Sequence, residues 1–345
     1  MQKIKKILEK VQKSIVFILW NIFVILVLFF ILEFLSGIFI SWYYSNENAI
    51  NYEVFPNKIY VEEYLEEVNS IKGVYSPYIE YTTEPNFSGK FINTNGNGLR
   101  KTSNPCSNKD AIKIFVFGGS TTWGGFSDET TIPSLISKKF CEKNINVEVT
   151  NFGLSGYENT KEVIKLELEL RNGNIPDIVI FYDGVNEVYS AFQNNKAGLP
   201  QNLENRRAEF NKKDKLNIGG FILYSDTMTV VRGISKKLFG NKEFDEGTEV
   251  EKLGSEIIDV YFSNLKIVKA LEREYGFETY FFWQPVIYLD KSLTEGEKSV
   301  ILGNVKPLYE STYPKMPTKI EALNFYDISD IFKNKEEPVY IDFAH

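Results

Sequence analysis

The single histidine of this 345-residue chain limits where proton-transfer chemistry can take place. It is His345, and Asp342 stands three residues before it. A carboxylate at that spacing can accept a hydrogen bond from the imidazole Nδ1–H, which leaves Nε2 to take a proton from a hydroxyl group. Nucleophilic catalysis then needs one more residue, a serine or threonine that the fold brings to His345.

The first candidate is Ser120, in the turn Gly118-Gly119-Ser120 directly after the apolar run 112–117. Glycines permit a tight turn and let a substrate approach the backbone closely. The turn lacks the Lys-Ser/Thr pair of a phosphate-binding loop, and the chain has no G-x-G-x-x-G. It also differs from the G-x-S-x-G nucleophile elbow, because Thr122 takes the place of the second glycine.

Two further turns follow apolar runs: Asn151–Gly156 and the segment Gly184-Val185-Asn186-Glu187. Each alone could be an ordinary turn rich in turn-forming residues. Together with the turn at Ser120 they matter, because turns that follow parallel strands lie at one edge of a sheet.

The elements that position these turns alternate between strands and helices. Such alternation predicts an α/β domain with a mostly parallel sheet covered on both faces, whose ligands bind at the carboxyl ends of the strands. The predicted strands are 112–117, 146–150, 177–182 and 278–283, and the predicted helices are 131–143, 160–171 and 253–275.

Taken in order, the four blocks resemble the signature of the SGNH (GDSL) hydrolase superfamily, over residues 110–345. The resemblance implies a flavodoxin-like three-layer α/β/α sandwich. It also implies acyl transfer in which Ser120 is the nucleophile, His345 the base and Asp342 the acid that orients it. The oxyanion would be held by the backbone N–H groups of Ser120 and Gly156 and by the Asn186 side-chain amide.

The chain departs from the superfamily pattern in three places. Gly119 stands where many members have aspartate, and Glu187 also replaces an aspartate. In the superfamily a loop and a helix follow the histidine, so either this sequence is a fragment or domain 111–345 lacks that helix. The activity of a chain that ends at His345 therefore stays open.

Residues 15–44 are apolar over more than the roughly 20 residues that a transmembrane helix needs. Five lysines lie within residues 1–14, a basic tail that we expect in the cytoplasm. This asymmetry predicts a single-pass anchor in the cytoplasmic (inner) membrane with the rest of the chain outside. A cleaved signal peptide is the alternative. Glu33, within the span, could contact a helix partner, be a functional polar residue or extend toward the membrane surface.

Residues 45–110 are rich in turn-forming residues, and we expect a stalk and a covering subdomain there. Residues 188–250 interrupt the α/β pattern as a polar insertion, with one predicted helix at 221–239. Cys106 and Cys141 should lie near the same end of the sheet. They could form a disulfide, or they could remain two unpaired buried thiols.

Composition excludes several kinds of function. The net charge is −7, and the five lysines at the N-terminus are part of that total, so the body is a poor polyanion binder and we expect no nucleic-acid partner. Two cysteines and one histidine exclude Cys/His-rich zinc sites. We expect neither a metal nor a cofactor.

The sequence therefore predicts a membrane-anchored serine esterase or O-acyltransferase. We expect it to act on ester groups, O-acetyl groups above all, of extracytoplasmic glycan. Trp123, Tyr157, Tyr182 and Tyr189 could stack on sugars or simply pack beneath loops. The alternatives are a lipid-directed acyl hydrolase and a non-catalytic module of the same fold that binds glycan or protein.

Overall fold

The computed structural model describes residues 2–47, 50–55, 57–211, 227, 228, 230, 231, 248–289 and 291–345. Within the chain, two units are compact in themselves. The first consists of Met1–Asn48 with Arg206–Glu243, and the second of Ala49–Asn205 with Phe244–His345. The helix predicted at 221–239 lies, apart from residues 227, 228, 230 and 231, outside the described residues.

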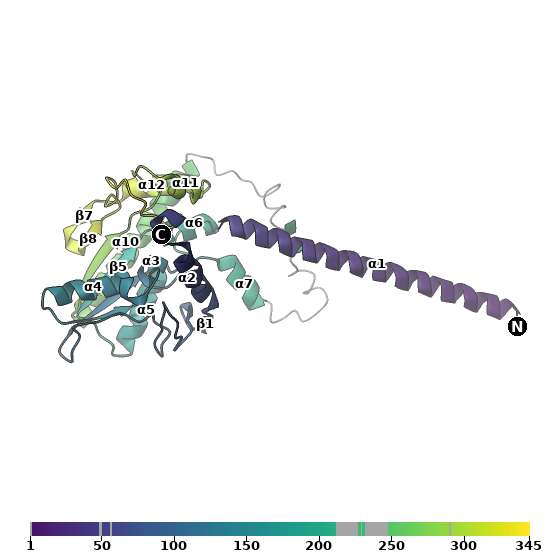
Figure 1. Cartoon of the computed structure of the whole chain (residues 1–345), viewed down its shortest axis with the longest axis horizontal. Helices are drawn as coiled ribbons and strands as arrows, with labels where there is room; N and C mark the ends of the chain where they lie inside the picture. Colours follow the sequence, from purple (N-terminus) through teal and green to yellow (C-terminus); the bar gives the residue numbers. More distant parts are fainter. Residues whose placement is uncertain are drawn as a thin grey trace. The chain divides into compact units, whose positions relative to one another are not determined.

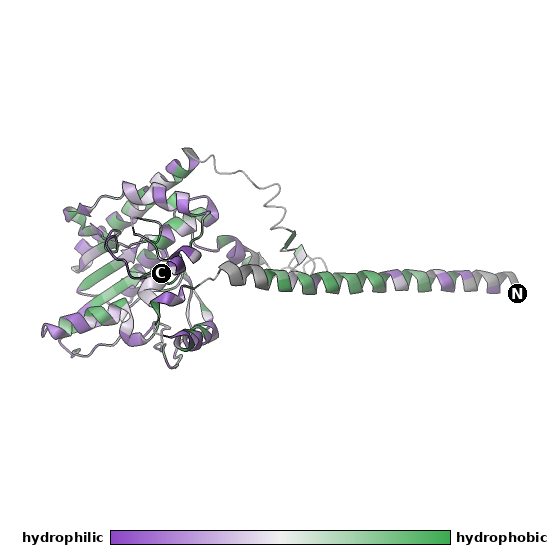
Figure 2. Cartoon of the chain, turned by 45° about the horizontal axis from the view of Figure 1, so that its top comes forward, coloured by the Kyte–Doolittle hydropathy of each residue, from purple (hydrophilic) through white to green (hydrophobic). Residues whose placement is uncertain are grey.

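The N-terminal segment is one continuous helix, α1 (Gln2–Glu47), which includes the basic tail. Its stretch Lys10–Ile40 is long and apolar enough to cross a membrane, and a signal sequence would have the same properties. Hydropathy colouring shows the helix hydrophobic over most of its length and more hydrophilic toward the N-terminus (Figure 2). Glu33 accepts a hydrogen bond at 3.1 Å from the backbone N–H of Thr227, so this acidic residue has a partner from the insertion.

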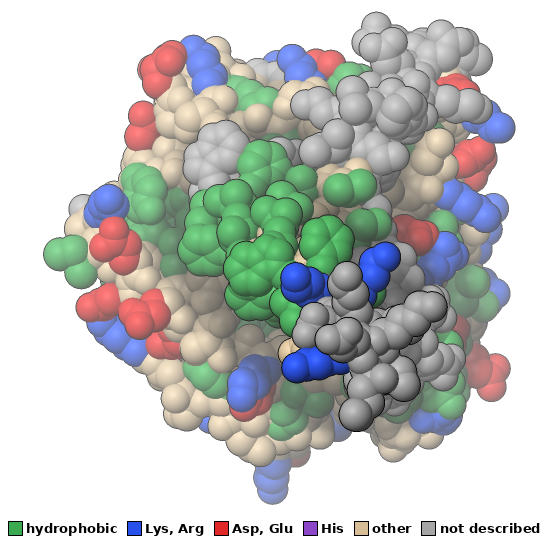
Figure 3. Space-filling view, turned by 90° about the vertical axis from the view of Figure 1, so that its right-hand side faces the viewer, with side chains coloured by type: hydrophobic (Ala, Val, Ile, Leu, Met, Phe, Trp, Pro, Cys, Tyr) green, Lys and Arg blue, Asp and Glu red, His purple; other side chains and the backbone are tan. Residues whose placement is uncertain are grey.

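The apolar character of this unit is visible in space-filling form. Seen from the side on which the N-terminus lies in Figure 1, hydrophobic side chains gather in one patch with basic side chains at its edge (Figure 3). The exposed large hydrophobic side chains of α1 are 38–70% exposed, and an exposed apolar surface of this kind is typical of a segment that meets lipid or a protein partner.

The second unit is the α/β body (Figure 1). Its strands are β1 (Gly73–Ser76), β2 (Glu80–Thr83), β3 (Ile112–Gly118), β4 (Val147–Asn151), β5 (Ile178–Asp183), β6 (Glu278–Trp283), β7 (Lys319–Ile320) and β8 (Phe325–Asp327). Its helices are α2 (Lys58–Ser70), α3 (Ser120–Trp123), α4 (Ile132–Glu142), α5 (Asn159–Arg171), α6 (Val185–Asn194), α10 (Thr248–Tyr275), α11 (Glu295–Ser299) and α12 (Lys306–Thr312). Helix α7 (Leu203–Asn211) follows α6 in the chain.

The main sheet has the order β4-β3-β5-β6-β8-β7. The first five strands are parallel, and β7 pairs antiparallel with β8. If the five parallel strands are renumbered 1 to 5 in chain order, their order across the sheet is 2-1-3-4-5, which is the flavodoxin-like arrangement. The predicted α/β fold with a mostly parallel sheet is therefore confirmed. In such a sheet a ligand site is expected beside the first strand, where the strand order reverses, and here that strand is β3.

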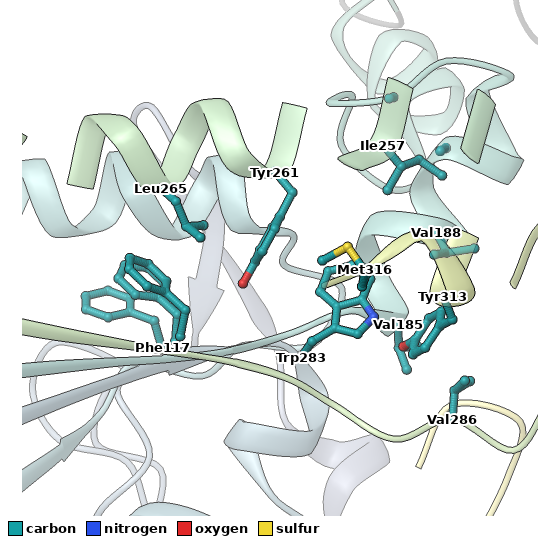
Figure 4. Packing of buried hydrophobic residues seen from close by; sticks show 14 of the residues in the cluster. Phe117, Val185, Val188, Ile257, Tyr261, Leu265, Trp283, Val286, Tyr313 and Met316 are labelled. Atoms are coloured by element: carbon teal, nitrogen blue, oxygen red, sulfur yellow. The ribbon is translucent and has the colours of Figure 1, made fainter. Parts of the chain in front are cut away.

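Alternation along the strands builds the core on both faces of this sheet. Phe117, Phe181 and Phe281 lie in register on β3, β5 and β6, with successive ring centroids 5.2 Å apart. This aromatic ladder and Trp283 pack under α5, α6 and α10. Tyr261 of α10 points toward the sheet (Figure 4). On the opposite face a smaller cluster packs under α4 and includes Ile114, Val116, Val147 and Val149. The even spacing of apolar residues along each strand produces both faces.

The predicted elements of the body each have an observed counterpart. The strands at 112–117, 146–150, 177–182 and 278–283 correspond to β3, β4, β5 and β6, and the helices at 131–143, 160–171 and 253–275 correspond to α4, α5 and α10. The last of these helices begins earlier than predicted, at Thr248. The short pair β7–β8 was not predicted, because strands of two and three residues carry almost no periodicity.

Of residues 45–110, expected to form a stalk and a covering subdomain, the described residues from Ile50 onward fall within the same compact unit as the sheet, whereas 45–47 belong to the first unit. Helix α2 and the hairpin β1–β2 lie here, and Tyr157 links the hairpin to the body by donating a hydrogen bond to the carbonyl of Ile79 at 3.1 Å. The two cysteines, Cys106 and Cys141, are joined in a disulfide with a Cα–Cα distance of 5.4 Å.

Candidate active site

Ser120 is the first residue of the short helix α3, which begins where β3 ends. The two preceding glycines make this turn. Gly118 has a φ of +155°, and a Cβ there would overlap Thr122. A Cβ on Gly119 would overlap the side-chain amide of Asn186. Glycine at 119 therefore gives Asn186 the room to lie against the turn, which accounts for the absence of aspartate at this position.

His345 lies against Ser120 although 225 residues separate them in the chain. Its Nε2 is 2.5 Å from Ser120 Oγ, and its Nδ1 is 2.8 Å from an Asp342 carboxylate oxygen. Asp342 also accepts hydrogen bonds from the backbone N–H groups of Ala344 and His345, at 2.7 and 2.8 Å. With the proton on Nδ1 held by Asp342, Nε2 can accept the proton of the Ser120 hydroxyl.

The charges of this pair shift both pKa values. Burial acts to lower the pKa of His345, but the Asp342 carboxylate outweighs it by its charge and its hydrogen bond, so the pKa lies above 6.5. Burial acts to raise the pKa of Asp342, yet the imidazole charge and the hydrogen bonds prevail and the pKa lies below 3.8. The two side chains are 31% and 29% exposed, so solvent and substrate can reach them.

The second turn carries Gly156 and is tied to the first by hydrogen bonds. The Leu154 N–H donates to the Gly118 carbonyl at 3.1 Å, and the Asn151 side chain donates to the carbonyls of Thr122 and Trp123, both at 3.2 Å. Gly156 has a φ of +74°, in the left-handed region that favours glycine.

The third turn carries Asn186, at the start of α6. Its Nδ2 donates to the Tyr157 carbonyl at 2.6 Å, and its Oδ1 accepts from Nε2 of Gln201 at 2.8 Å. Both contacts fix the side-chain amide, and the second N–H on Nδ2 is left as a donor beside Gly119. Gln201 also lies next to Gly156, where an added Cβ would be 3.2 Å from its Oε1.

Glu187 has a structural role behind this turn. Its carboxylate accepts hydrogen bonds from the backbone N–H groups of Asn159, at 2.7 Å, and Gly184, at 2.6 Å. It therefore joins the start of α5 to the start of α6 and holds the Asn186 turn in place.

Buried acidic side chains lie in the same region. Burial raises the pKa of Glu158 to about 7, although Lys161 opposes the shift. Burial and the charges of neighbouring carboxylates raise the pKa values of Glu162 and Asp183 well above their ordinary values. In the part of the chain that the structure describes, no group of three or more His, Cys, Asp or Glu side chains is arranged to hold a metal ion.

The structure joins Ser120, His345 and Asp342 by hydrogen bonds and places the Asn186 amide against Gly119, while Gly156 lies beside Gln201, which bonds to Asn186. It adds Gln201, which the sequence offered no way to find, because it is one polar residue in the insertion 188–250. Of the four aromatic residues suggested for sugar stacking, Tyr157 is 2% exposed and Trp123 lines the cleft beside Ser120. Burial of Tyr157 excludes it as a stacking surface.

No protein-family model matches the chain, and no curated protein is similar to it in sequence. Among solved structures, the acetyl xylan esterase AlAXEase is 15% identical, with 68% of this chain and 91% of that chain covered and a TM-score of 0.34. A carbohydrate acetylesterase family member from Sinorhizobium meliloti is 16% identical, covering 68% and 89% with a TM-score of 0.31. AlinE4, an SGNH-hydrolase family esterase, is 11% identical, covering 69% and 88% with a TM-score of 0.32. These sequence identities and TM-scores are too low to transfer an activity to this chain. They show a similarity to SGNH-hydrolase family esterases and nothing further.

Proposed function

We propose that this chain is a membrane-anchored serine esterase that acts on carboxylic esters outside the cytoplasmic membrane. The observation that carries the proposal is the hydrogen-bonded chain from Ser120 through His345 to Asp342. A hydroxyl in contact with an imidazole whose other nitrogen is held by a carboxylate is the arrangement that activates serine for acyl transfer.

The reaction proceeds in two halves. Ser120 Oγ bonds to the ester carbonyl carbon while His345 Nε2 takes its proton, and the carbonyl oxygen becomes an oxyanion. The imidazolium then gives this proton to the departing alcohol, and the acyl group stays on Ser120. In the second half His345 takes a proton from water, which attacks the acyl carbon and releases the acid as Ser120 regains its proton.

Three donors would stabilise the oxyanion: the backbone N–H groups of Ser120 and Gly156 and the Asn186 amide. The fixed orientation of Asn186 between Tyr157 and Gln201 supports this role, because donors held in place before the reaction need no reorganisation during it. Loss of one such donor typically lowers the rate by about 10²–10³-fold.

If a sugar hydroxyl replaces water as the attacking group, the same residues catalyse O-acyl transfer. The proposed extracytoplasmic position rests on the five lysines within residues 1–14, which precede the apolar residues 15–44, and agrees with a disulfide between Cys106 and Cys141, which persists in oxidising compartments. Glycan esters outside the membrane remain the substrate class that this location favours.

The location has a direct test. We expect the chain to stay with membranes during alkaline extraction. A C-terminal tag should be digested by protease added to intact spheroplasts. A tag protected until the spheroplasts are lysed would overturn the topology.

The catalytic proposal is tested with the full chain in detergent micelles and p-nitrophenyl esters. We expect Ser120→Ala to lower kcat/KM by about 10⁴–10⁶-fold, as for removal of a nucleophile that acts with a base. Ser263→Ala is the matched control, because this exposed hydroxyl on α10 donates only to the carbonyl of Asp259. Equal rates for Ser120→Ala and the unaltered chain would favour the alternative, a module that binds glycan or protein without catalysis.

A further inference from the structure

A cleft of about 550 Å³ opens beside Ser120 and His345. One wall is made by α2 and β2, and the other by the segment that follows Ser120. The C-terminal segment closes one end with Ile341, Asp342 and His345. The region 50–110 therefore supplies much of the lining of a cleft that Ser120 and His345 also line.

The walls of this cleft are mainly apolar. Helix α2 contributes Tyr64, Leu65 and Val68, which share one face because their spacing follows the helical repeat. Trp123 and Phe126 contribute from the opposite wall. Among the described lining residues the charged ones are Lys72, which is exposed, and Asp342, which is held by His345.

The wall that follows Ser120 is rigidly supported by a buried arginine. The Arg100 side chain is fully buried and pairs with Asp128 at 2.9 Å. It also donates to the carbonyls of Trp123, Gly124 and Phe126 and lies 4.6 Å from the Trp123 ring centroid. A wall fixed in this way is a preformed binding surface.

The position of the cleft indicates which half of an ester it takes. In the acyl-enzyme the acyl carbon is bonded to Ser120 Oγ, whereas the alcohol leaves beside His345 Nε2. Eight lining residues come from the segment 121–132 that directly follows Ser120, against three from the C-terminal segment that carries His345. The acyl chain, which starts at Ser120, is therefore the part that runs along this wall.

The volume of the cleft indicates the length of the acyl chain that it can bind. An acetyl group fills no more than about three water volumes of about 30 Å³ each, so most of the cleft would stay empty or wet. Resting on the esterase function proposed above, we propose that the cleft binds an apolar acyl chain of about four to eight carbons. The proposal therefore replaces the acetyl group expected from the sequence with a longer acyl chain. It does not specify the alcohol, which can still be a sugar hydroxyl.

The first test varies the two halves of the ester separately. With the full chain in micelles, we expect kcat/KM to rise about three- to fourfold for each added methylene from p-nitrophenyl acetate to the hexanoate, as expected for burial of one methylene. Lengthening the alcohol from ethyl to hexyl acetate should change kcat/KM less than threefold. A maximum at acetate, or a steeper dependence on alcohol length than on acyl length, would overturn the proposal.

The second test fills the cleft. Val68→Phe narrows it, and we expect the octanoate-to-acetate ratio of kcat/KM to fall at least tenfold. Glu66→Phe is the matched control, because this exposed residue of α2 does not line the cleft, and its ratio should stay as in the unaltered chain. An unchanged ratio in Val68→Phe contradicts the proposal. Hydrolysis of all chain lengths with no preference would contradict only the proposed acyl site. The absence of Ser120-dependent hydrolysis would contradict the proposed esterase function itself.

Discussion

The two ring nitrogens of His345 have separate partners, and each partner has its own effect on reactivity. Asp342 holds the Nδ1 side and raises the pKa of the imidazole above 6.5, while Nε2 faces Ser120. The base works only when it is neutral. Catalysis should therefore be weak at acid pH and should increase through an inflection above pH 6.5.

Asp342→Asn tests this electrostatic account. The substitution removes the charge that raises the pKa of His345 and leaves burial, which acts to lower it. We expect kcat/KM to fall by about 10³–10⁴-fold, because an amide no longer fixes the reactive tautomer. We also expect the acid inflection of the pH–rate profile to move to lower pH. An inflection that stays in place would show that Asp342 does not set the pKa of the base.

Gln201 donates a hydrogen bond to Asn186, and if Asn186 stabilises the oxyanion as proposed, Gln201 should act as a positioning residue. We expect Gln201→Leu to lower kcat by about tenfold with little change in KM, because the Asn186 amide loses the donor that fixes its Oδ1. The decisive measurement is a double-mutant cycle: in the Asn186→Ala background, Gln201→Leu should have almost no further effect.

Gln193→Leu is the control for this cycle, since that glutamine on α6 bonds to Asn202 and not to Asn186. Additive effects of Gln201→Leu and Asn186→Ala would mean that Gln201 acts independently of the amide.

At the scale of elements, much of the body could be predicted from the sequence. Strands β3, β5 and β6 are apolar runs that end in turn-forming residues, and the rule that parallel strands end at one edge places Ser120 and Asn186 together. The cleft could not be predicted, because the residues that line it together with the apolar face of α2 lie far along the chain, after Ser120. Gln201 could not be predicted either, since a single amide in a polar loop has no pattern.

The buried carboxyl groups on α5 and β5 predict an unusual dependence of stability on pH. Raised pKa values mean that the folded chain keeps protons that the unfolded chain loses. For Glu158 this stabilisation is complete below the ordinary pKa of 4.5 and is lost as the pH rises through about 7. Glu162 and Asp183 shift in the same direction. The body should therefore have a higher Tm near pH 5 than near pH 8.

Glu162→Gln should reduce this dependence, because the amide stays neutral at every pH. The dependence is measured as the Tm at several pH values from 5 to 8, with thermal unfolding monitored by circular dichroism. Glu167→Gln, on the exposed side of the same helix, should leave the slope unchanged. A steeper slope in Glu162→Gln would contradict the assignment of the neutral form to Glu162.

At the scale of the whole molecule, the disulfide connects the segment just before β3 to the end of α4. It closes a loop over a sequence separation of 35 residues. In the chain-entropy model such a loop stabilises the folded state by roughly 3–4 kcal/mol. We expect Cys106→Ser with Cys141→Ser, or dithiothreitol added to the unaltered protein, to lower the Tm by several degrees. No change of Tm on reduction would contradict this role.

The proposed anchor and the proposed catalytic site belong to different compact units of the chain. Helix α1 presents an apolar surface, whereas the second unit holds Ser120, His345 and the acyl cleft among its own residues. The residues proposed for catalysis and for the oxyanion hole, and the cleft, all come from one compact unit.

The most direct test of the account is covalent labelling of the nucleophile. Treated with a fluorophosphonate and analysed by peptide mass spectrometry, the full chain should carry one phosphonyl group, on Ser120. Its rate of labelling should rise with pH through the same inflection as catalysis, and His345→Ala should abolish it. Labelling at another residue, or labelling of Ser120 that is unaffected by His345→Ala, would contradict the claim that this histidine activates this serine.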